Sequence, residues 1–419
     1  MPPVGDQLNT TLNVPVFLAR KVRHAPNGSF SATVTRIGVI SIALGLAILI
    51  VAFAVLFGFK NTIQQKIFLF GAHLQVSKFT NNASYEETAL PLNTPLYRDS
   101  TRIPGVQHIQ AVALKAGILK TDKELTGVIL KGVGRDYDWN LLRESLVAGT
   151  VPVVGADTGS GSTQILLSQY MANQLNVNVG ESLPLYFLGK PPRARKMTVV
   201  GIYDTGLEEV DKTIALGDIR LIQRLNRWGV DSVATYEIFV KDFKKVEATA
   251  NNVFDVMSPD MRLTRVTDQY QPLFDWMLLL DRNMVILLSL IGFVASFNMV
   301  SVLLVLMIER TPMIGLLKAI GGPNPLIRRM FVFVGLNMVL WGLFFGNVIG
   351  LGFCFLQDRF KLIPLDPKNY FMNYVPIIWD WPTILALNAA TILLIALVLW
   401  IPTTIINRIQ PIKALAFKK

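Results

Sequence analysis

The chain has 419 residues, of which 52% are hydrophobic, and its formal net charge is +11 at pH 7. Nucleic-acid binding is excluded as the reason for this charge, because the excess lies in three short segments beside long apolar runs rather than in a groove-sized patch. The single cysteine, Cys354, excludes an intrachain disulfide, so each domain must be stabilised by its own core.

Four runs lack Asp, Glu, Lys and Arg, and each exceeds the roughly 20 residues that a helix needs to cross a bilayer. These runs are residues 37–59, 283–308, 330–357 and 381–407. They predict a membrane protein with four transmembrane α-helices and a large α+β extracytoplasmic domain inserted between helices 1 and 2. The remaining segments are 1–36, 60–282, 309–329, 358–380 and 408–419.

Basic residues indicate the orientation of the four spans. The segments 1–36, 309–329 and 408–419 carry twelve Lys and Arg against Asp6 and Glu309, whereas the rest of the chain holds 28 basic and 27 acidic residues. Because cytoplasmic loops carry an excess of basic residues, we expect these three segments in the cytoplasm and residues 60–282 outside it.

Residues 60–282 are numerous enough for one large domain or two small ones. The first span is predicted to continue as a helix over 61–70, and apolar residues at helical spacing from Leu273 to Leu280 predict that the second span also begins outside the bilayer. Between them the patterns predict a mixed α+β domain. Its predicted strands are 74–78, 127–131, 182–188, 196–202 and 235–240, with a helix over 169–176 and another ending near residue 257.

A turn rich in cations and proline, LGKPPRARK, is predicted over residues 188–196. A solvated hairpin tip and a docking site for a partner protein are equally favoured for this turn. The candidate docking residues are Lys190, Pro191, Pro192, Arg193, Arg195 and Lys196.

Catalytic and metal-binding patterns are missing from the sequence. The histidines are dispersed along the chain, at His24, His73 and His108, which argues against a metal site. The pair Gly189-Lys190 is followed by proline and does not complete a phosphate-binding loop. We therefore expect a subunit that is not an enzyme and carries no cofactor of its own.

The loop between the second and third spans, ERTPMIGLLKAIGGPNPLIRR, predicts a short helix from Pro312 to Ile320. Proline suits the first turn of a helix, and Gly321-Gly322-Pro323 is a sequence that ends one. The apolar side chains of this helix are expected to be exposed and to bind a partner protein. They are Met313, Ile314, Leu316, Leu317 and Ile320.

Several stretches of the chain are similar to one protein family. The stretch LVLMIERTPMIGLLKAIGG resembles the coupling region of the FtsX/MacB-type ABC transporter permeases. Within them the chain looks most like the lipoprotein-releasing LolC/LolE group, through ILLSQYMANQLNVNVGESLPL, VVGIYDTGLEEVDKTIAL and NRIQPIKALAFK. The resemblance covers nearly the whole chain. It implies a type VII ABC transporter-like fold in the bacterial inner membrane, with cytoplasmic termini and a periplasmic domain.

By this resemblance, the helix from Pro312 to Ile320 is a coupling helix that inserts into a separate, LolD-like ATPase dimer, which carries the ATP and Mg. The implied coupling residues are Glu309, Arg310, Pro312, Met313, Ile314, Gly315, Leu316, Leu317, Lys318, Ala319, Ile320 and Gly321. Further implied partners are a second permease copy or a sister permease, a lipoprotein substrate, a LolA-like periplasmic carrier and membrane lipid.

Two features depart from the family pattern. Met313 stands where many members have an acidic residue, and the turn 188–196 is shorter than the carrier-binding hook of one family subunit.

Extraction of a lipoprotein from the bilayer exposes its acyl chains to water, which costs about 0.8 kcal/mol per methylene. The implied activity therefore needs an apolar surface that shelters these chains, as well as ATP. Spans one and two are expected to provide this shelter, although ordinary lipid contact or helix packing better explains any single residue. The predicted lipid-facing residues are Leu44, Ile48, Val51, Val55, Leu287, Ile291, Val294 and Asn298. Amides within the spans are expected to bond between helices rather than line a path, namely Asn298, Asn337, Asn347 and Asn388.

Two other functions fit parts of the sequence. A mechanotransmitting permease would drive periplasmic efflux, as in the MacB type, or regulate cell-wall hydrolases, as in the FtsX type. MacB-type chains carry a fused ATPase where only 36 residues precede the first span here, and FtsX-type chains have a much smaller outer domain, so both contrasts favour lipoprotein release. A stand-alone receptor would leave the apolar coupling helix without a role.

Overall fold

The computed structural model describes residues 30–80, 88–143, 145–155, 161–188, 192–366, 370 and 372–399. The chain divides into two compact units, which we call the membrane unit and the sheet unit. The membrane unit comprises Met1–Phe59, Leu278–Ile363 and Val375–Lys419, and the sheet unit comprises Lys60–Met277 and Pro364–Tyr374.

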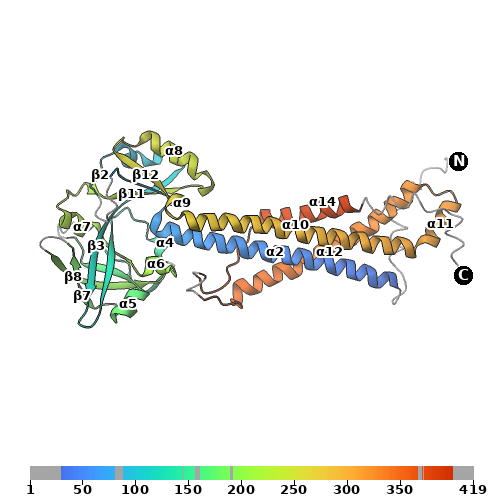
Figure 1. Cartoon of the computed structure of the whole chain (residues 1–419), viewed down its shortest axis with the longest axis horizontal. Coiled ribbons are helices and arrows are strands. Elements are labelled where there is room, and N and C mark those ends of the chain that lie inside the picture. Colours follow the sequence, from blue (N-terminus) through green and yellow to red (C-terminus); the bar gives the residue numbers. More distant parts are fainter. Residues whose placement is uncertain are drawn as a thin grey trace, which may run out of the picture. The chain divides into compact units, whose positions relative to one another are not determined.

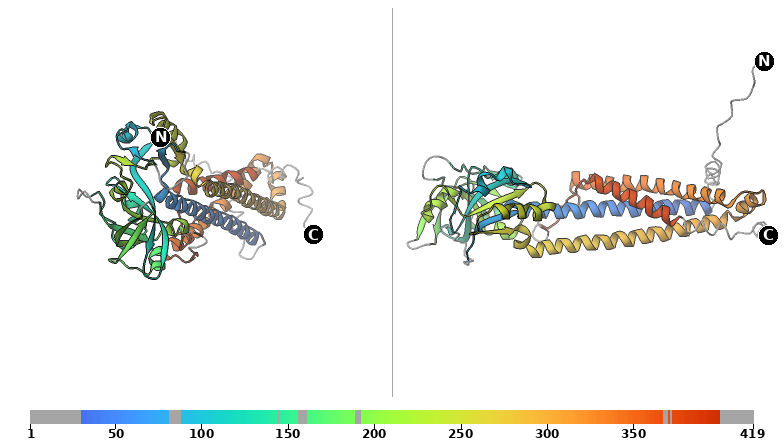
Figure 2. Two further views of the ribbon diagram at one scale, coloured as in Figure 1. Left: turned by 60° about the vertical axis from the view of Figure 1, so that its left-hand side comes forward. Right: turned by 90° about the horizontal axis from the view of Figure 1, so that it is seen from above.

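Among the described residues, four helices are long and apolar enough to cross a membrane, which confirms the four predicted spans (Figure 1 and Figure 2). They are α2 (Phe30–Gly71), α10 (Gln271–Glu309), α12 (Asn324–Phe360) and α14 (Trp381–Val398). A short helix, α11 (Thr311–Ala319), connects α10 to α12. α2 and α10 extend beyond their apolar runs over the predicted residues 61–70 and 273–280. Residues 400–407 of the fourth predicted span lie outside the described residues.

Glycines on one face of α12 bring it close to α2. A Cβ atom added at Gly342 would lie 2.6 Å from Ile42 Cγ2, and one added at Gly346 would lie 2.9 Å from the Ala43 carbonyl oxygen. Gly350 continues the same spacing of four residues, which places all three glycines on one side of the helix. Small residues at such positions allow membrane helices to pack backbone against backbone.

Gly346→Leu is expected to push α12 away from α2 and to lower the thermal unfolding midpoint of the detergent-purified protein by about 5 °C, since overpacking a tight interface destabilises it. Gly352→Leu is the matched control, because a Cβ atom there meets no atom of the described residues within 4 Å. Intrinsic fluorescence during heating measures both variants. Equal midpoints for the two would contradict the glycine interface.

Amide side chains join the helices of the membrane unit. Asn298 Nδ2 on α10 donates a hydrogen bond to Ser41 Oγ on α2. Asn347 Nδ2 on α12 donates to Asn388 Oδ1 on α14 at 2.7 Å, and Asn388 Nδ2 donates to Asn347 Oδ1 at 3.1 Å. Hydrogen bonding between helices is therefore confirmed for these three asparagines.

The sheet unit is a mixed α+β domain, as predicted (Figure 1). Its strands are β1 (Leu74–Lys78), β2 (Leu90–Pro91), β3 (Val106–Lys120), β4 (Leu125–Val133), β5 (Leu146–Gly149), β6 (Gln164–Ser168), β7 (Ser182–Phe187), β8 (Arg193–Tyr203), β9 (Ile214–Asp218), β10 (Ser232–Val233), β11 (Thr235–Val240) and β12 (Met261–Arg265). Its short helices are α3 (Pro95–Arg98), η1 (Ser100–Arg102), α4 (Asn140–Arg143), α5 (Gln169–Leu175), α6 (Glu208–Asp211), α7 (Ile219–Asn226), η2 (Phe243–Lys245), α8 (Val246–Val256) and α9 (Val266–Gln269).

Ten of these strands form one sheet in the order β12-β1-β11-β3-β4-β9-β6-β8-β5, and β7 pairs with both β3 and β8. The pairings β3-β4-β9-β6-β8-β7 return to β3, so six strands close into a ring. β4 is parallel to β9 and β6 is parallel to β8, whereas the other pairs in the ring are antiparallel. Aliphatic side chains such as Leu130, Leu167 and Leu185 belong to one buried core cluster.

His73, just after α2, is half-buried between aromatic rings. Its ring packs edge-on against Phe68 and Phe239, with centroids 4.2 and 5.6 Å away, and its Nδ1 accepts a hydrogen bond from the Val240 N–H at 2.9 Å. Burial lowers the pKa of His73 from 6.5 to about 4.

The folded state is expected to lose about 3 kcal/mol of stability at His73 as the pH falls from 6.5 to 4, because the unfolded chain binds a proton there that the folded chain excludes. His73→Asn keeps an acceptor near the Nδ1 position and removes this titration. Denaturant unfolding of the full chain at pH 7.5 and 4.5 measures the effect. An unchanged pH dependence in His73→Asn would contradict the assignment.

Candidate functional site

The membrane unit contains an apolar cavity of about 540 Å³ between α2, α10 and α14. Its walls are mainly aliphatic, and representative residues from the three helices are Ile42, Leu46, Leu288, Ile291, Leu387 and Leu394. A volume of this size falls within the range of roughly 300–1,000 Å³ that is common for ligand pockets.

Two glycines line the cavity, and large exposed side chains mark its rim. Gly45 and Gly292 contribute no side chain to its walls. Phe293, Leu393 and Leu397 also line it and are 72%, 69% and 64% exposed. The cavity therefore opens sideways, toward the surroundings of the helices.

Three hydroxyl groups interrupt the apolar lining. Ser289 Oγ donates to the Val285 carbonyl oxygen, and Thr391 Oγ1 donates to the Leu387 carbonyl oxygen, each at 2.8 Å within its own helix. Ser296 Oγ is buried and has no hydrogen-bond partner among the described residues.

The predicted lipid-facing residues and the cavity lie mainly on different helix faces. Of the eight predicted residues, only Ile291 lines the cavity. On α2 the lining positions 42, 45, 46 and 49 are rotated by about 140° from the predicted positions 44, 48, 51 and 55, at about 100° per residue. Four of the others are exposed on the surface outside the cavity, namely Leu44, Ile48, Leu287 and Val294. The remaining three are half-buried, namely Val51, Val55 and Asn298. The contribution of α14 was not predicted, because this helix is apolar on every side and its sequence favours no face.

α11 divides its apolar side chains between two faces. Ile314 is buried in the core of the membrane unit, and Met313 and Leu317 pack against that core. Leu316 and Ile320 are 55% and 73% exposed. The expectation that all five apolar side chains are exposed was therefore wrong, since three of them fix α11 to the membrane unit.

The exposed residues of α11 and its end form one stripe. Pro312, Leu316, Ala319 and Ile320 are exposed at positions i, i+4, i+7 and i+8, which face the same side of a helix. We call these four residues the α11 stripe. Glu309 is also exposed, Gly315 is buried, and Arg310 and Lys318 are half-buried. Gly321 has φ = +90°, the left-handed conformation in which glycine ends helices, so the predicted helix end is confirmed.

The hairpin between β7 and β8 has a shorter turn than the predicted 188–196. β7 ends at Phe187 and β8 begins at Arg193, so the candidate docking residues Arg193, Arg195 and Lys196 belong to a strand. The Arg193 guanidinium donates to the Leu225 carbonyl oxygen at 3.2 Å. Pro192, Arg195 and Lys196 are exposed, and Lys190 and Pro191 lie outside the described residues.

The stretch VVGIYDTGLEEVDKTIAL has a structural role at the junction of β8, α6 and β9. The buried Asp211 carboxylate accepts hydrogen bonds from the N–H groups of Thr205 and Gly206, at 3.0 to 3.3 Å, and from Thr205 Oγ1 at 2.8 Å. Burial raises the pKa of Asp211 from 3.8 to about 6, and the bonds from Thr205 act in the opposite direction. This carboxylate holds the turn after β8 closed.

Both halves of the chain match families of known proteins. The MacB-like periplasmic core domain matches residues 37–280, and the FtsX-like permease C-terminal family matches residues 285–411. The lipoprotein-releasing system transmembrane protein LolC of Neisseria meningitidis is 24% identical, with 95% of this chain and 98% of that protein covered. LolC of Xylella fastidiosa is 22% identical, with 95% and 97% covered. LolE of Haemophilus influenzae is 22% identical, with 97% and 100% covered.

Proposed function

We propose that this chain, which belongs to the FtsX/MacB-type family of ABC transporter permeases, is the transmembrane subunit of an ATP-driven transporter that extracts lipoproteins from a membrane. Its relatives named for lipoprotein release match it over nearly its full length. The observation that carries the proposal is the sideways-open apolar cavity between α2, α10 and α14.

The cavity suits an acyl chain that enters from the surrounding lipid. Its lining on α14 runs from Leu387 to Leu397, about 15 Å at 1.5 Å per residue, which is half of the roughly 30 Å hydrocarbon thickness. Each methylene that it shelters saves about 0.8 kcal/mol of exposure to water.

A separate ATPase subunit supplies the energy. The α11 stripe offers this subunit an exposed apolar surface, whereas the buried side of α11 ties that surface to the membrane unit. Binding of ATP and Mg in a LolD-like dimer would favour one arrangement of the spans over another, and this shift drives release.

The charge pattern and the family support a proposal for the location and the other partners. We place the chain in the bacterial inner membrane, with its termini and α11 in the cytoplasm and the sheet unit in the periplasm. Four spans are few for an enclosed path, so a second copy or a sister permease completes the transporter. The exposed Pro192, Arg195 and Lys196 of the β7-β8 hairpin are available to a LolA-like carrier that receives the lipoprotein.

Reconstitution tests this function. The chain is purified in mild detergent with its ATPase subunit and placed in liposomes with an acylated lipoprotein and a soluble carrier. We expect ATP to transfer the lipoprotein to the soluble fraction, and the same protein without its acyl chains serves as the control substrate. Purification with a regulator of cell-wall hydrolases, together with no ATP-dependent transfer, would favour a mechanotransmitting permease instead.

A further inference from the structure

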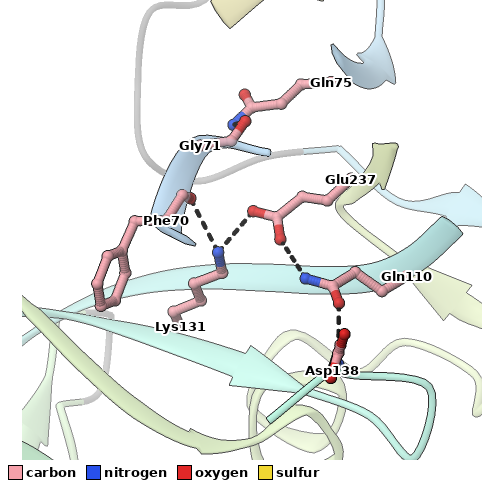
Figure 3. A network of polar contacts seen from close by, with 7 residues as sticks. All are labelled: Phe70, Gly71, Gln75, Gln110, Lys131, Asp138 and Glu237. Carbon is pink, nitrogen blue, oxygen red and sulfur yellow. Dashed lines mark hydrogen bonds and ion pairs between the residues drawn. The ribbon is translucent and has the colours of Figure 1, made fainter. Parts of the chain in front are cut away.

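A buried polar network joins the last turn of α2 to the middle of the sheet (Figure 3). Lys131 Nζ on β4 donates to the Phe70 carbonyl oxygen at 2.9 Å and to Glu237 Oε1 on β11 at 2.6 Å. Gln110 Nε2 on β3 donates to Glu237 Oε2 at 2.8 Å, and Gln110 Oε1 accepts from the Asp138 N–H at 3.1 Å. The network therefore ties one helix end to three adjacent strands.

The centre of this network is shielded from water. The side chains of Lys131 and Glu237 are 2% and 3% exposed, and the rings of Phe70 and Tyr137 each lie 5.8 Å from Lys131 Nζ. A buried ion pair adds little net stability, because the loss of hydration offsets the attraction between the charges. The positions of the two charged groups are nevertheless tightly restricted, because each buried charge must keep its hydrogen-bond partners. Stability alone therefore does not account for this pair.

The ion pair holds the end of α2 through the Phe70 carbonyl group. The last four carbonyl groups of a helix have no partner within the helix, and they form the negative end of its dipole. Lys131 supplies a cation to one of these groups at the end of α2. Glu237 and β4 hold the Lys131 ammonium group in place. They therefore also fix the position of the end of α2 along the helix axis and its rotation about that axis.

Apolar contacts hold the same turn of α2. Leu69 and Phe70 are buried in a cluster with Val112 of β3, Val133 of β4 and Leu216 of β9. α10, the other long helix that continues into the sheet unit, follows α9 and β12 in the chain, and β12 is one of the two edge strands of the sheet. α2 is thus anchored at the central strands, whereas α10 follows an edge strand.

We propose that Lys131 and Glu237 are positioning residues that lock the end of α2 to the central strands, so that the sheet unit follows each movement of α2 as one body. This inference rests on the proposed function, in which ATP in the partner subunit displaces the membrane-spanning helices. Without the lock, α2 turns or slides beneath the sheet, and ATP hydrolysis proceeds without productive movement of the sheet unit.

The double variant Lys131→Met/Glu237→Met tests the lock in liposomes that contain the ATPase subunit and an acylated lipoprotein. It replaces both charges by apolar side chains of similar length. The unfolding midpoint of the variant is measured as well, because the Phe70 carbonyl group and Gln110 Nε2 each lose a hydrogen-bond partner. We expect the amount of lipoprotein released per ATP hydrolysed to fall roughly tenfold or more, with the ATPase rate maintained. Wild-type release per ATP in the folded double variant would overturn the proposal.

The pair Arg265 and Glu247 provides a control in the same unit. Arg265 Nη2 on β12 lies 2.9 Å from Glu247 Oε2 on α8, and the two side chains are 33% and 65% exposed. Arg265→Met/Glu247→Met also removes an ion pair from the sheet unit, yet it leaves the end of α2 locked. Release per ATP should therefore stay at the wild-type level, and an equal fall in this variant would also overturn the proposal.

A distance measurement decides the question even if the double variant does not fold. Spin labels are placed at the exposed residues Gln65 of α2 and Leu125 of β4, in a full chain with Cys354→Ala. We expect one narrow distance distribution that is the same with and without ATP. A shift on ATP binding of about 5 Å, one helical turn, would refute the lock. This result does not depend on the lipoprotein, so it stands even if the release assay shows that the proposed function is wrong.

Discussion

Leu316→Asp in α11 is expected to abolish binding of the ATPase subunit to the membrane complex. Leu316 is 55% exposed and lies in the α11 stripe, which the proposed interface buries. An unpaired carboxylate in an apolar cleft costs several kcal/mol, and a loss of about 3 kcal/mol already weakens binding about 100-fold. Co-purification of the ATPase subunit with the tagged chain measures the effect.

Two further variants make this experiment specific. Leu317→Asp is a poor probe, because Leu317 packs against the core of the membrane unit and its replacement disturbs folding as well. Leu125→Asp makes the same change at a leucine that is 63% exposed in the sheet unit, and it should leave the ATPase subunit bound. Wild-type recovery of the ATPase subunit with Leu316→Asp would show that α11 is not the coupling helix.

Ala390→Trp is expected to fill the cavity and to stop lipoprotein release while ATP hydrolysis continues. Ala390 lines the cavity on α14, where a bulky ring takes the space proposed for the acyl chain. If the ring excludes only four methylenes of the acyl chain, the binding free energy of that acyl chain falls by about 3 kcal/mol. Its binding is then about 100-fold weaker. ATP-dependent transfer of a labelled lipoprotein from liposomes to the soluble fraction measures the loss.

Ala389→Trp is the control for this variant. Ala389 precedes Ala390 on the same helix but does not line the cavity, and neighbouring helix residues point about 100° apart. The control adds the same bulk outside the cavity, so release should continue at the wild-type level. Normal release by Ala390→Trp, or an equal loss in both variants, would argue against an acyl chain in this cavity.

The membrane part of the fold could be predicted because its signals are local. A run of uncharged residues such as 37–59 predicts a span wherever the rest of the chain goes, since the cost of a charge in lipid does not depend on the fold. Pro312 and Gly321 act through their own backbones to mark the beginning and end of α11. In the sheet unit, the predicted strands 74–78 and 235–240 coincide with β1 and β11.

The longest strand, β3, was not predicted, because buried polar residues interrupt its apolar pattern. Gln110 is 1% exposed and Lys115 is 9% exposed, although both residue types usually face water. Gln110 is buried because Glu237 on the neighbouring strand accepts its hydrogen bond. Glu237 is 127 residues away in the sequence, so pattern reading along β3 cannot detect this partner.

The sequence by itself determined the four spans, the helical extensions of α2 and α10 and the ends of α11, because each depends on residues within a few turns of one another. Only the tertiary structure decided which faces of the spans line the cavity and which side of α11 is exposed. Along a uniformly apolar helix such as α14, the neighbouring helices alone distinguish one face from another. The pairing of Lys131 with Glu237 was also decided at this level, since β4 and β11 come close only because both pair with β3.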